Sequence, residues 1–324
     1  MKDNYYINSN GQLNRKENTI YFENENEKKP IPIEKIYSLY IFGAVTISSQ
    51  ALRLFSKKHV PIHFYSRNEY YSGSFHPRKS KVSGNVLTKQ SEHYNNEEKR
   101  LKIARKLVEG SCKNMSRNLT RYDHGEDKEK IEENLKELEE CKRNTEIMNV
   151  EARCRKIYYK AFDEILPDKF SFKKREKQPP KNMANALISF GNSLMYGTCL
   201  TEIYKTQLNP SRSSLHEPSD RRYSLSLDLA DVFKPVIVDR TIFYLTNKKK
   251  LKEEDFRNDL NKCLLNEEGK KKFLNRYEDT LKRTIKHKGL NRKVSYKRLI
   301  RLECYKLIKH VLGTKEYKPF VIWW

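Results

Sequence analysis

Acidic side chains in apolar surroundings are the first feature of this 324-residue chain that points to chemistry. Residues 145–166 are predicted to form a helix whose apolar side chains recur at steps of three, four and seven. Those side chains are Ile147, Cys154, Tyr158, Ala161 and Ile165. Glu151 falls in the same stripe, and a carboxylate facing a protein core is costly unless it is paired or bound to a metal. Glu151 is therefore either a metal ligand or the partner of an arginine from another helix.

A second acidic pair lies in the segment from Leu225 to Pro235. Asp228 and Asp231 are three residues apart, which places them on one face of a helix, and Lys234 follows after another three. Pro235 is expected to kink or end that helix. Two carboxylates so placed can share a divalent cation, or they can be ordinary solvated acids. The apolar residues between them indicate a largely buried segment and favour the cation.

His216 precedes this acidic helix in the sequence Leu215-His216-Glu217-Pro218. The apolar Leu215 before it and its position just upstream of Asp228 distinguish it from the other histidines. His59 and His63, by contrast, flank a strand-like Val-Pro-Ile run and are interpreted as structural. His216 is thus the histidine that the sequence favours as part of the same site.

The charge of the chain favours a polyanionic partner. Its 66 Lys and Arg exceed its 42 Asp and Glu, which gives a formal net charge of +24. Between Leu281 and Lys318, 13 Lys or Arg accompany only 2 acids. The apolar spacing there predicts a helix with one buried and one basic face, which would contact DNA phosphates or simply be solvated.

Cysteine usage and hydropathy indicate the cellular compartment of the protein. The six cysteines are far apart and form no CxxC pair, which is typical of reduced, mostly buried thiols. The start MKDNYYIN is unlike a secretory signal, and no stretch approaches the roughly 18 apolar residues of a membrane span. We therefore expect a soluble cytoplasmic protein without membrane contact.

The first 85 residues are predicted to be a β-rich domain. Strand-like segments rich in β-branched and aromatic residues occupy 4–7, 19–22, 36–42, 60–65 and 70–75. One short amphipathic helix, Ser48 to Lys58, interrupts them. The polar stretch from His76 to Asn85 is expected to hold the domain boundary.

Residues 86–324 are predicted to be helical, with almost no strands. The helices with the clearest period are 100–119, 128–141, 145–166, 183–204 and 223–233. The Lys-, Phe- and Pro-rich segment 168–181 is interpreted as a flexible connection that could meet a phosphate backbone.

With these features in place, the chain resembles the integrases of the CRISPR adaptation machinery, the Cas1 family, nearly end to end. The stretches that carry the resemblance are Ile33–Gly43, Ser48–Leu52, Val60–Phe64, Asn185–Gly197, Leu215–Pro218, Ser224–Arg240, and Tyr317–Phe320 with two final tryptophans. The residue after Glu151 is Ala152, where that family often has glycine.

The resemblance implies an α+β protein with a β-sandwich-like N-terminal domain followed by a larger all-α catalytic domain. It also implies metal ligands at Glu151, His216 and Asp231, with Asp228 beside them and Lys234 within reach of a phosphate or a carboxylate. Two hard oxygens and one imidazole suit Mg²⁺ or Mn²⁺.

The implied activity is metal-dependent joining of a DNA 3′-hydroxyl to a phosphodiester by transesterification, with hydrolysis as the side reaction. The implied partners are double-stranded DNA, a second copy of the chain, and the small ferredoxin-like adaptation protein Cas2. The 1–85 domain would serve dimerisation and partner contact, and residues 86–324 would bind metal and DNA. Two alternatives stay open: a stand-alone structure-specific DNA endonuclease and a non-catalytic basic nucleic-acid-binding scaffold.

Overall fold

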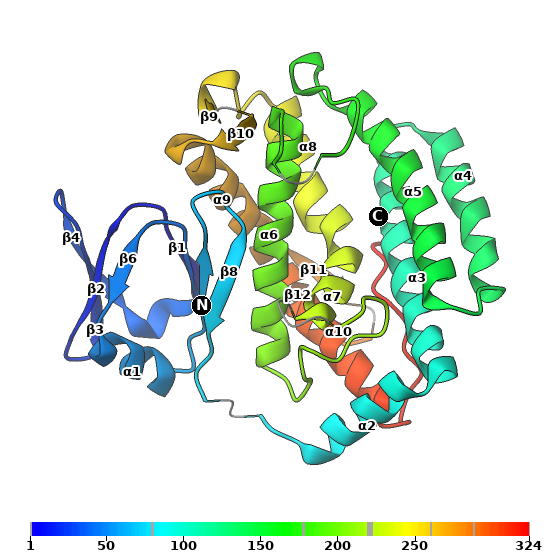
Figure 1. The fold of residues 1–324 in the computed structure, drawn as a ribbon, viewed down its shortest axis with the longest axis horizontal. Coiled ribbons are helices and arrows are strands. Elements are labelled where there is room, and N and C mark those ends of the chain that lie inside the picture. Colours follow the sequence, from blue (N-terminus) through cyan, green and yellow to red (C-terminus); the bar gives the residue numbers. More distant parts are fainter. Residues whose placement is uncertain are drawn as a thin grey trace. The chain divides into compact units, whose positions relative to one another are not determined.

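A computed structural model describes residues 2–78, 81–176, 179–218, 223–259, 261–287 and 289–323. Figure 1 shows the order of the elements along the chain. The chain divides into two compact units, residues 1–82 and 83–324. The stretches discussed above include residues that lie outside the described ones, among them Met1, Lys79, Ser80, Lys177, Gln178, Lys288 and Trp324.

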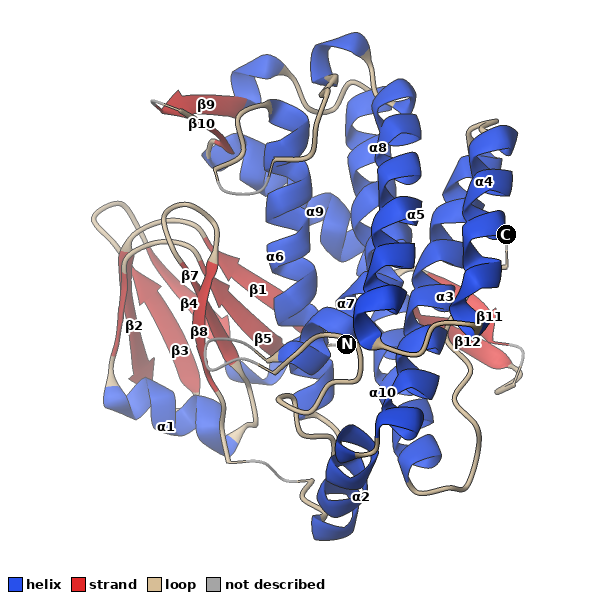
Figure 2. Ribbon diagram, turned by 45° about the vertical axis from the view of Figure 1, so that its right-hand side comes forward, coloured by secondary structure: helices blue, strands red, loops and turns tan. Residues whose placement is uncertain are grey.

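The first unit is built from two four-stranded sheets and one helix (Figure 2). One sheet has the order β1 (Asp3–Ile7), β5 (Ile36–Ile41), β7 (Ile62–Tyr65) and β8 (Tyr71–Phe75). The other has the order β4 (Lys28–Pro32), β3 (Thr19–Glu23), β2 (Gly11–Lys16) and β6 (Val45–Ile47). Helix α1 (Ser49–Lys57) begins where the Ser48 side chain accepts a hydrogen bond from the Ala51 N–H.

Apolar side chains from both sheets and α1 form one core. Its fully buried members include Leu13, Ile20, Leu39, Phe55 and Ile62. The predicted sandwich-like domain is therefore confirmed. Strands β2, β4 and β6 were not predicted. Strand β2 buries only one of its six residues, and β4 carries two prolines. Prolines are tolerated in β4 because it lies at the edge of its sheet.

The second unit is mainly helical. Its helices are α2 (Gly84–Asn95), α3 (Glu97–Arg121), α4 (Gly125–Lys136), α5 (Asn144–Ile165), α6 (Met183–Tyr204), α7 (Ser224–Lys234), α8 (Arg240–Asn247), α9 (Glu267–Lys282) and α10 (Tyr296–Val311). Helix α6 is buried almost all round, as expected for a central helix. Helix α7 packs against α3 and α6, and α3 also packs against α5. The predicted α+β class with a larger helical domain is confirmed.

Four short strands correct the expectation that this unit has almost none. They form two hairpins, β9 (Phe256–Asp259) with β10 (Lys262–Leu265) and β11 (Thr284–His287) with β12 (Arg292–Ser295). The helix predicted from the apolar spacing within the basic stretch 281–318 is α10, whereas the residues just before it pair as strands. Among its described residues, α9 ends at Lys282, α10 spans Tyr296–Val311, and Thr284–His287 pairs with Arg292–Ser295 between them.

Helix α7 ends at Lys234, directly before Pro235, in agreement with the prediction that Pro235 ends or kinks it. Pro235 begins a π-helical turn, Pro235–Asp239, that leads directly into α8. Such turns widen the helix by one residue and are common at functional sites. All six cysteines are buried thiols outside any disulfide, as predicted. Among the residues that the structure describes, no helix is long and apolar enough to cross a membrane.

Candidate metal centre

Helix α5 buries Glu151, as its stripe position indicated. The side chain is buried, beside Ile147 and Cys154 of the same face. Its partner is Arg155, one turn further along the same helix, whose Nε and Nη2 donate to Glu151 Oε1 over 2.9 and 2.7 Å. The arginine partner considered from the sequence does exist, although it comes from α5 itself.

Helix α7 presents Asp231 to the same place. Lys234 Nζ donates to Asp231 Oδ1 over 2.6 Å, and Arg155 Nη2 lies 2.9 Å from that same oxygen. Burial alone would raise the pKa of Asp231, but the charges of Lys234, Arg155 and His216 outweigh it and hold this pKa well below its usual range. Asp231 is therefore a carboxylate kept ionised in a buried position.

Asp228 faces a different direction from Asp231. Its side chain is fully buried and accepts hydrogen bonds from the backbone N–H groups of Ser214, Leu215 and His216 at 2.8, 3.1 and 3.0 Å. The ring Nδ1 of His216 lies 2.9 Å from Asp228 Oδ1. With four donors around it, Asp228 fastens the loop that carries His216 rather than turning to a shared ion with Asp231.

Other elements hold the same loop. The Gln90 amide of α2 donates to the carbonyls of Asn209 and Arg212. Arg100 Nε of α3 and Asn144 Nδ2 of α5 both donate to the Ser214 carbonyl. The described part of this loop, residues 205–218, contains no helix or strand, but its backbone is tied to the helices around it.

The two ring nitrogens of His216 face two different aspartates. Nδ1 pairs with Asp228, and Nε2 lies 3.8 Å from Asp231 Oδ2. Burial would lower the pKa of His216, but the hydrogen bond and charge of Asp228, together with Asp231, raise it. Since Asp228 accepts only, Nδ1 carries a proton, and Nε2 is the nitrogen directed at Asp231.

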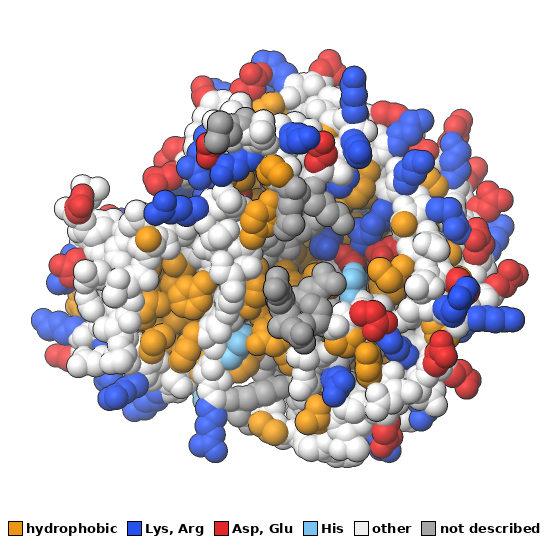
Figure 3. Space-filling view, viewed as in Figure 1, with side chains coloured by type: hydrophobic (Ala, Val, Ile, Leu, Met, Phe, Trp, Pro, Cys, Tyr) orange, Lys and Arg blue, Asp and Glu red, His pale blue; other side chains and the backbone are white. Residues whose placement is uncertain are grey.

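Glu151, His216, Asp231 and Lys234 line one groove of about 1250 Å³. Its cationic lining residues are Arg153, Arg155, Lys156, Lys160, Lys173, Lys174, Arg175 and Lys234, against the acids Glu151, Asp163 and Asp231. Figure 3 shows a hollow in which Lys or Arg, acidic and histidine side chains meet. The structure thus brings four of the five predicted site residues to one groove, with Asp228 behind His216.

Comparison with known proteins fits this geometry. A family model described as "CRISPR associated protein Cas1" matches residues 5–279. CRISPR-associated protein Cas1 1 of Methanobrevibacter ruminantium is 58% identical over 327 residues, which cover 100% of this chain and 99% of the relative. The chain belongs to the Cas1 family. The resemblance seen in the sequence is therefore confirmed.

Further members of the Cas1 family agree. The CRISPR-associated endonuclease Cas1 of Methanothermobacter thermautotrophicus is 54% identical, with 100% of this chain and 96% of the relative covered. A Cas1 protein from Thermotoga maritima, known as a solved structure, is 39% identical with a TM-score of 0.91, over 98% of this chain and 100% of that one. The fold and the family therefore extend over the whole chain.

More distant structures share the fold alone. A casposase bound to integration product is 21% identical with a TM-score of 0.87, over 98% of this chain and 93% of that one. A Cas6-RT-Cas1–Cas2 complex contains a chain that is 15% identical with a TM-score of 0.85, over 100% of this chain and 36% of that one.

The donor set of this Cas1-family chain fits a hard divalent cation. Glu151 and Asp231 offer carboxylate oxygens, and His216 offers Nε2 because Asp228 fixes the opposite nitrogen. The 3.8 Å between His216 Nε2 and Asp231 Oδ2 is too long for a hydrogen bond. Two ligands at about 2.1 Å from one ion lie at most about 4.2 Å apart, so the separation suits a shared ion. We call Glu151, His216 and Asp231 the candidate metal centre.

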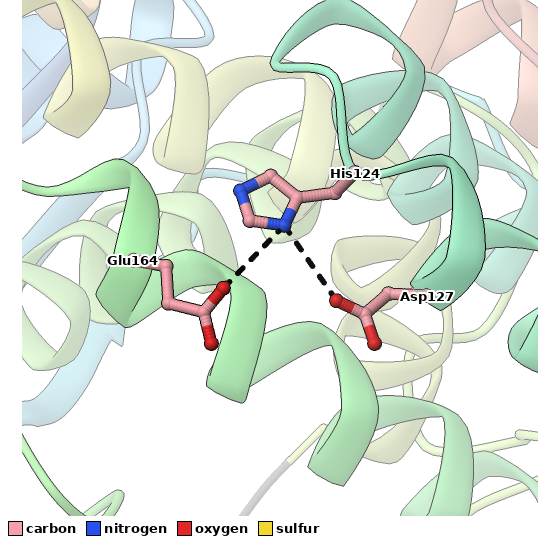
Figure 4. Close-up of side chains that lie close together, drawn as sticks. All are labelled: His124, Asp127 and Glu164. Carbon is pink, nitrogen blue, oxygen red and sulfur yellow. Dashed lines mark ion pairs between the residues drawn. The ribbon is translucent and has the colours of Figure 1, made fainter.

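A second histidine–carboxylate cluster lies at the other end of α5 (Figure 4). His124 Nδ1 is 3.6 Å from Asp127 Oδ2 and 3.7 Å from Glu164 Oε2. Among the described residues, these three have ligand atoms that all lie within 4.8 Å of one another. The Glu164 side chain is 53% exposed, whereas that of Glu151 is 8% exposed. This cluster was not predicted from the sequence, because its residues lie in no apolar stripe.

Arg155 is the site residue that the sequence analysis missed. Its signal was present, since it follows Glu151 by four residues and therefore lies on the same helix face. Burial would lower the pKa of Arg155, but Glu151 and Asp231 raise it well above its ordinary value. The guanidinium therefore remains charged between the two carboxylates.

The connection 168–181 is less free than expected. In its described part, Phe170 and Phe172 are buried, and Arg175 donates to Asn185 Oδ1 and Ser189 Oγ of α6 over 2.8 and 3.0 Å. These contacts hold the basic side chains of this segment along the groove.

Proposed function

We propose that this chain is a metal-dependent DNA integrase of CRISPR adaptation, which joins the 3′-hydroxyl ends of new spacer DNA to the repeat by transesterification. The observation that carries the proposal is the candidate metal centre on the wall of a groove lined by eight cations and three acids. Family membership supports it, because relatives are named CRISPR-associated endonucleases. The shared fold of a casposase bound to integration product is consistent with a joining reaction.

Glu151, His216 and Asp231 would hold Mg²⁺ or Mn²⁺. The ion would polarise a non-bridging oxygen of the scissile phosphate, offset the charge that grows during displacement and help to align the 3′-hydroxyl. Asp228 keeps the proton on His216 Nδ1 and so leaves Nε2 as the ligand nitrogen.

Lys234 and the basic groove would serve the DNA. Lys234 Nζ contacts Asp231 and lines the groove, so it lies beside the position of a phosphate at the metal centre. Cations such as Lys156, Lys173 and Lys174 would pair with phosphates on either side of the reacting one. Such contacts position DNA without reading its sequence, and they weaken as salt rises.

The proposed assembly contains double-stranded DNA, a second copy of the chain and the small adaptation protein Cas2. The fold shared with a chain of a Cas6-RT-Cas1–Cas2 complex supports this choice of partner. In the proposal the β-rich domain, residues 1–85, serves dimerisation and partner contact, and residues 86–324 bind metal and DNA in the cytoplasm.

The decisive variant is Asp231→Ala. We expect it to abolish Mn²⁺-dependent joining of a short duplex to a repeat-containing plasmid, since it removes a metal ligand while the groove cations remain. DNA binding, measured by fluorescence anisotropy at one fixed salt concentration, should change less than about threefold. Joining at the wild-type rate by this variant contradicts the assignment of the site.

Glu151→Gln tests the second ligand, with Glu164→Gln on the same helix as the matched control. We expect the first to lose metal-dependent catalysis in a folded protein and the second to keep it, because Glu164 lies in the other cluster. A general collapse of stability in the first variant would instead mean that Glu151 serves only its ion pair with Arg155.

A stand-alone structure-specific endonuclease is the second candidate, favoured by the names of the relatives. The same site with water as the nucleophile would hydrolyse the phosphodiester. Donor DNA with a free 3′-hydroxyl and donor DNA with a 3′-dideoxy end separate the two functions. Covalent product only with the free hydroxyl identifies an integrase, cleavage with either donor identifies an endonuclease, and no metal-dependent turnover identifies a scaffold.

A further inference from the structure

Arg155 connects the two carboxylates of the candidate metal centre. Its Nη2 is 2.7 Å from Glu151 Oε1 and 2.9 Å from Asp231 Oδ1, and its Nε adds a bond to Glu151. The side chain therefore crosses from α5 to α7 and is 22% exposed. A planar guanidinium can satisfy two carboxylates at once and stays charged when buried. Arg155 thus pairs with the same two carboxylates that a divalent cation would bind, although with one positive charge instead of two.

Arg155 and a metal cation compete for the carboxylates of Glu151 and Asp231. Arg155 is paired with one oxygen of each carboxylate, and a cation bound to the same carboxylates would be repelled by it, because like charges in a buried position are poorly screened. Among the described residues, the spacing in which three ligand atoms lie within 4.8 Å of one another is met by the cluster of Figure 4 and not by the candidate metal centre. Side chains of the candidate metal centre must therefore move before all three ligands can bind one ion, and the contacts of Arg155 with Glu151 and Asp231 oppose that movement.

The groove gives Arg155 another partner. Arg155 itself lines it, as do Lys156 and Lys160 of the same helix. A guanidinium that turns away from the carboxylates remains in this groove, where the phosphates of bound DNA would lie. Arginine binds a phosphate with two parallel hydrogen bonds, which repays the loss of its carboxylate contacts.

We propose that Arg155 is an internal counter-ion which the metal displaces and a DNA phosphate then receives, so that metal and DNA bind cooperatively. The proposal rests on the proposed metal centre. DNA draws Arg155 away from Glu151 and Asp231 and so raises their affinity for the ion, and by linkage the ion raises the affinity for DNA by the same factor. Without DNA, Arg155 keeps the centre poorly loaded and restrains metal-dependent cutting.

The test measures Mn²⁺ binding directly, by the electron paramagnetic resonance signal of free Mn²⁺, with and without a 3′-dideoxy duplex that cannot be joined. Arg155→Gln removes the counter-ion at similar length. Without DNA, this variant should bind Mn²⁺ about tenfold more tightly than the wild-type chain. The duplex should tighten wild-type Mn²⁺ binding about tenfold and that of the variant less than about twofold.

Arg153→Gln is the matched control. Arg153 lies two residues from Arg155 and lines the same groove, but its guanidinium pairs with Glu137 and Asn134. Its loss removes the same charge from the groove without touching the metal ligands. The Mn²⁺ affinity of this variant without DNA should stay within about twofold of the wild-type value.

Arg155→Lys is a second variant for the case that Arg155→Gln does not fold, which thermal melts would reveal. Lysine keeps the charge but does not donate to both carboxylates in the fixed fork of arginine, so this variant should bind Mn²⁺ with an affinity between those of the wild type and Arg155→Gln. If Arg155→Gln does not fold, tighter binding by Arg155→Lys still supports the proposal, and equal or weaker binding overturns it.

Asp231→Asn separates the failure of this proposal from that of the metal centre. If Asp231→Asn binds Mn²⁺ as well as the wild type, the ion lies elsewhere and both are overturned. If Asp231→Asn loses Mn²⁺ binding while folded Arg155→Gln binds Mn²⁺ no more tightly than the wild type, the metal centre stands and the role of Arg155 is overturned. An equal effect of DNA on Arg155→Gln and the wild type overturns the coupling.

Discussion

The two sides of His216 are held in place by different means. On the side of Nδ1, Asp228 accepts three backbone N–H groups of the loop as well as the ring nitrogen. On the side of Nε2, Asp231 is surrounded by the side chains of Lys234 and Arg155. Backbone donors cannot leave, whereas lysine and arginine side chains can rotate to other partners.

This difference separates the fixed part of the site from the exchangeable part. Asp228 belongs to the fold, because removing it would leave the backbone of the His216 loop without its acceptor. Arg155 and Lys234 are held by side-chain ion pairs, in which another anion or cation can replace the present partner.

Asp228→Asn weakens the acceptor that fixes the loop of His216. The amide keeps one acceptor oxygen but turns an NH₂ group toward donors, so we expect a loss of about 2–4 kcal/mol of unfolding free energy. Metal affinity should also fall about 10- to 100-fold, because His216 loses the partner that orients its ring. Urea unfolding and Mn²⁺ titration measure the two effects. Wild-type stability in this variant would mean that other contacts alone hold the loop.

Asp239 is a buried acid like Asp231, but among the described residues its hydrogen bond comes from a tyrosine, whereas Asp231 pairs with Arg155 and Lys234. Its Oδ2 accepts the hydroxyl of Tyr158, and burial raises the pKa of Asp239 to about 7 despite that hydrogen bond and the more distant positive charges. In the unfolded chain the pKa would be near 3.8. Stability is therefore lost as the pH rises from about 4 to about 7, since the unfolded state gives up a proton that the folded state keeps.

Asp239→Asn should remove that loss. The variant should gain stability relative to the wild type as the pH rises through this window, by at most about 1.4 kcal/mol per pH unit, and the gain should be constant above it. Thermal or urea unfolding of both proteins between pH 4 and 8 measures the difference. Parallel curves would show that Asp239 is ionised in the folded chain at low pH.

Glu164→Gln gives the smallest effect. Its carboxylate and that of Asp127 approach one nitrogen of His124, and the Glu164 side chain is half exposed. Solvent screens such pairs, so we expect a change in stability below about 0.5 kcal/mol and an unchanged Mn²⁺ requirement for joining. Loss of metal-dependent activity in this variant would show that the catalytic metal binds at the cluster of Figure 4.

Sequence patterns predicted the parts of the site that lie on regular helices. The stripe position of Glu151 indicated its burial, and the step from Asp228 to Asp231 indicated one helix with two acids. Their different directions were not predictable, because they depend on a loop, Ser214 to His216, that folds back onto Asp228. Spacing along a helix specifies a face, but the partner of that face comes from tertiary packing.

The fold was predictable where apolar residues alternate or recur at helical steps. Strand β2 and the hairpin of β11 and β12 were missed because their residues are mostly polar and exposed. The π-helical turn after Pro235 was also missed. A proline usually ends or bends a helix, and only the packing around Val236 to Val238, all buried, shows that the chain continues in a wider turn.

The central claim is that Glu151, His216 and Asp231 bind the catalytic ion. Crystals of the protein soaked in Mn²⁺, with the ion located by its anomalous scattering, test it most directly. The account predicts a peak within about 2.3 Å of His216 Nε2 and of oxygens of Asp231 and Glu151, with Arg155 turned away from both carboxylates. A peak confined to the cluster of His124, or no ion while Arg155 keeps both of its contacts at saturating Mn²⁺, would contradict it.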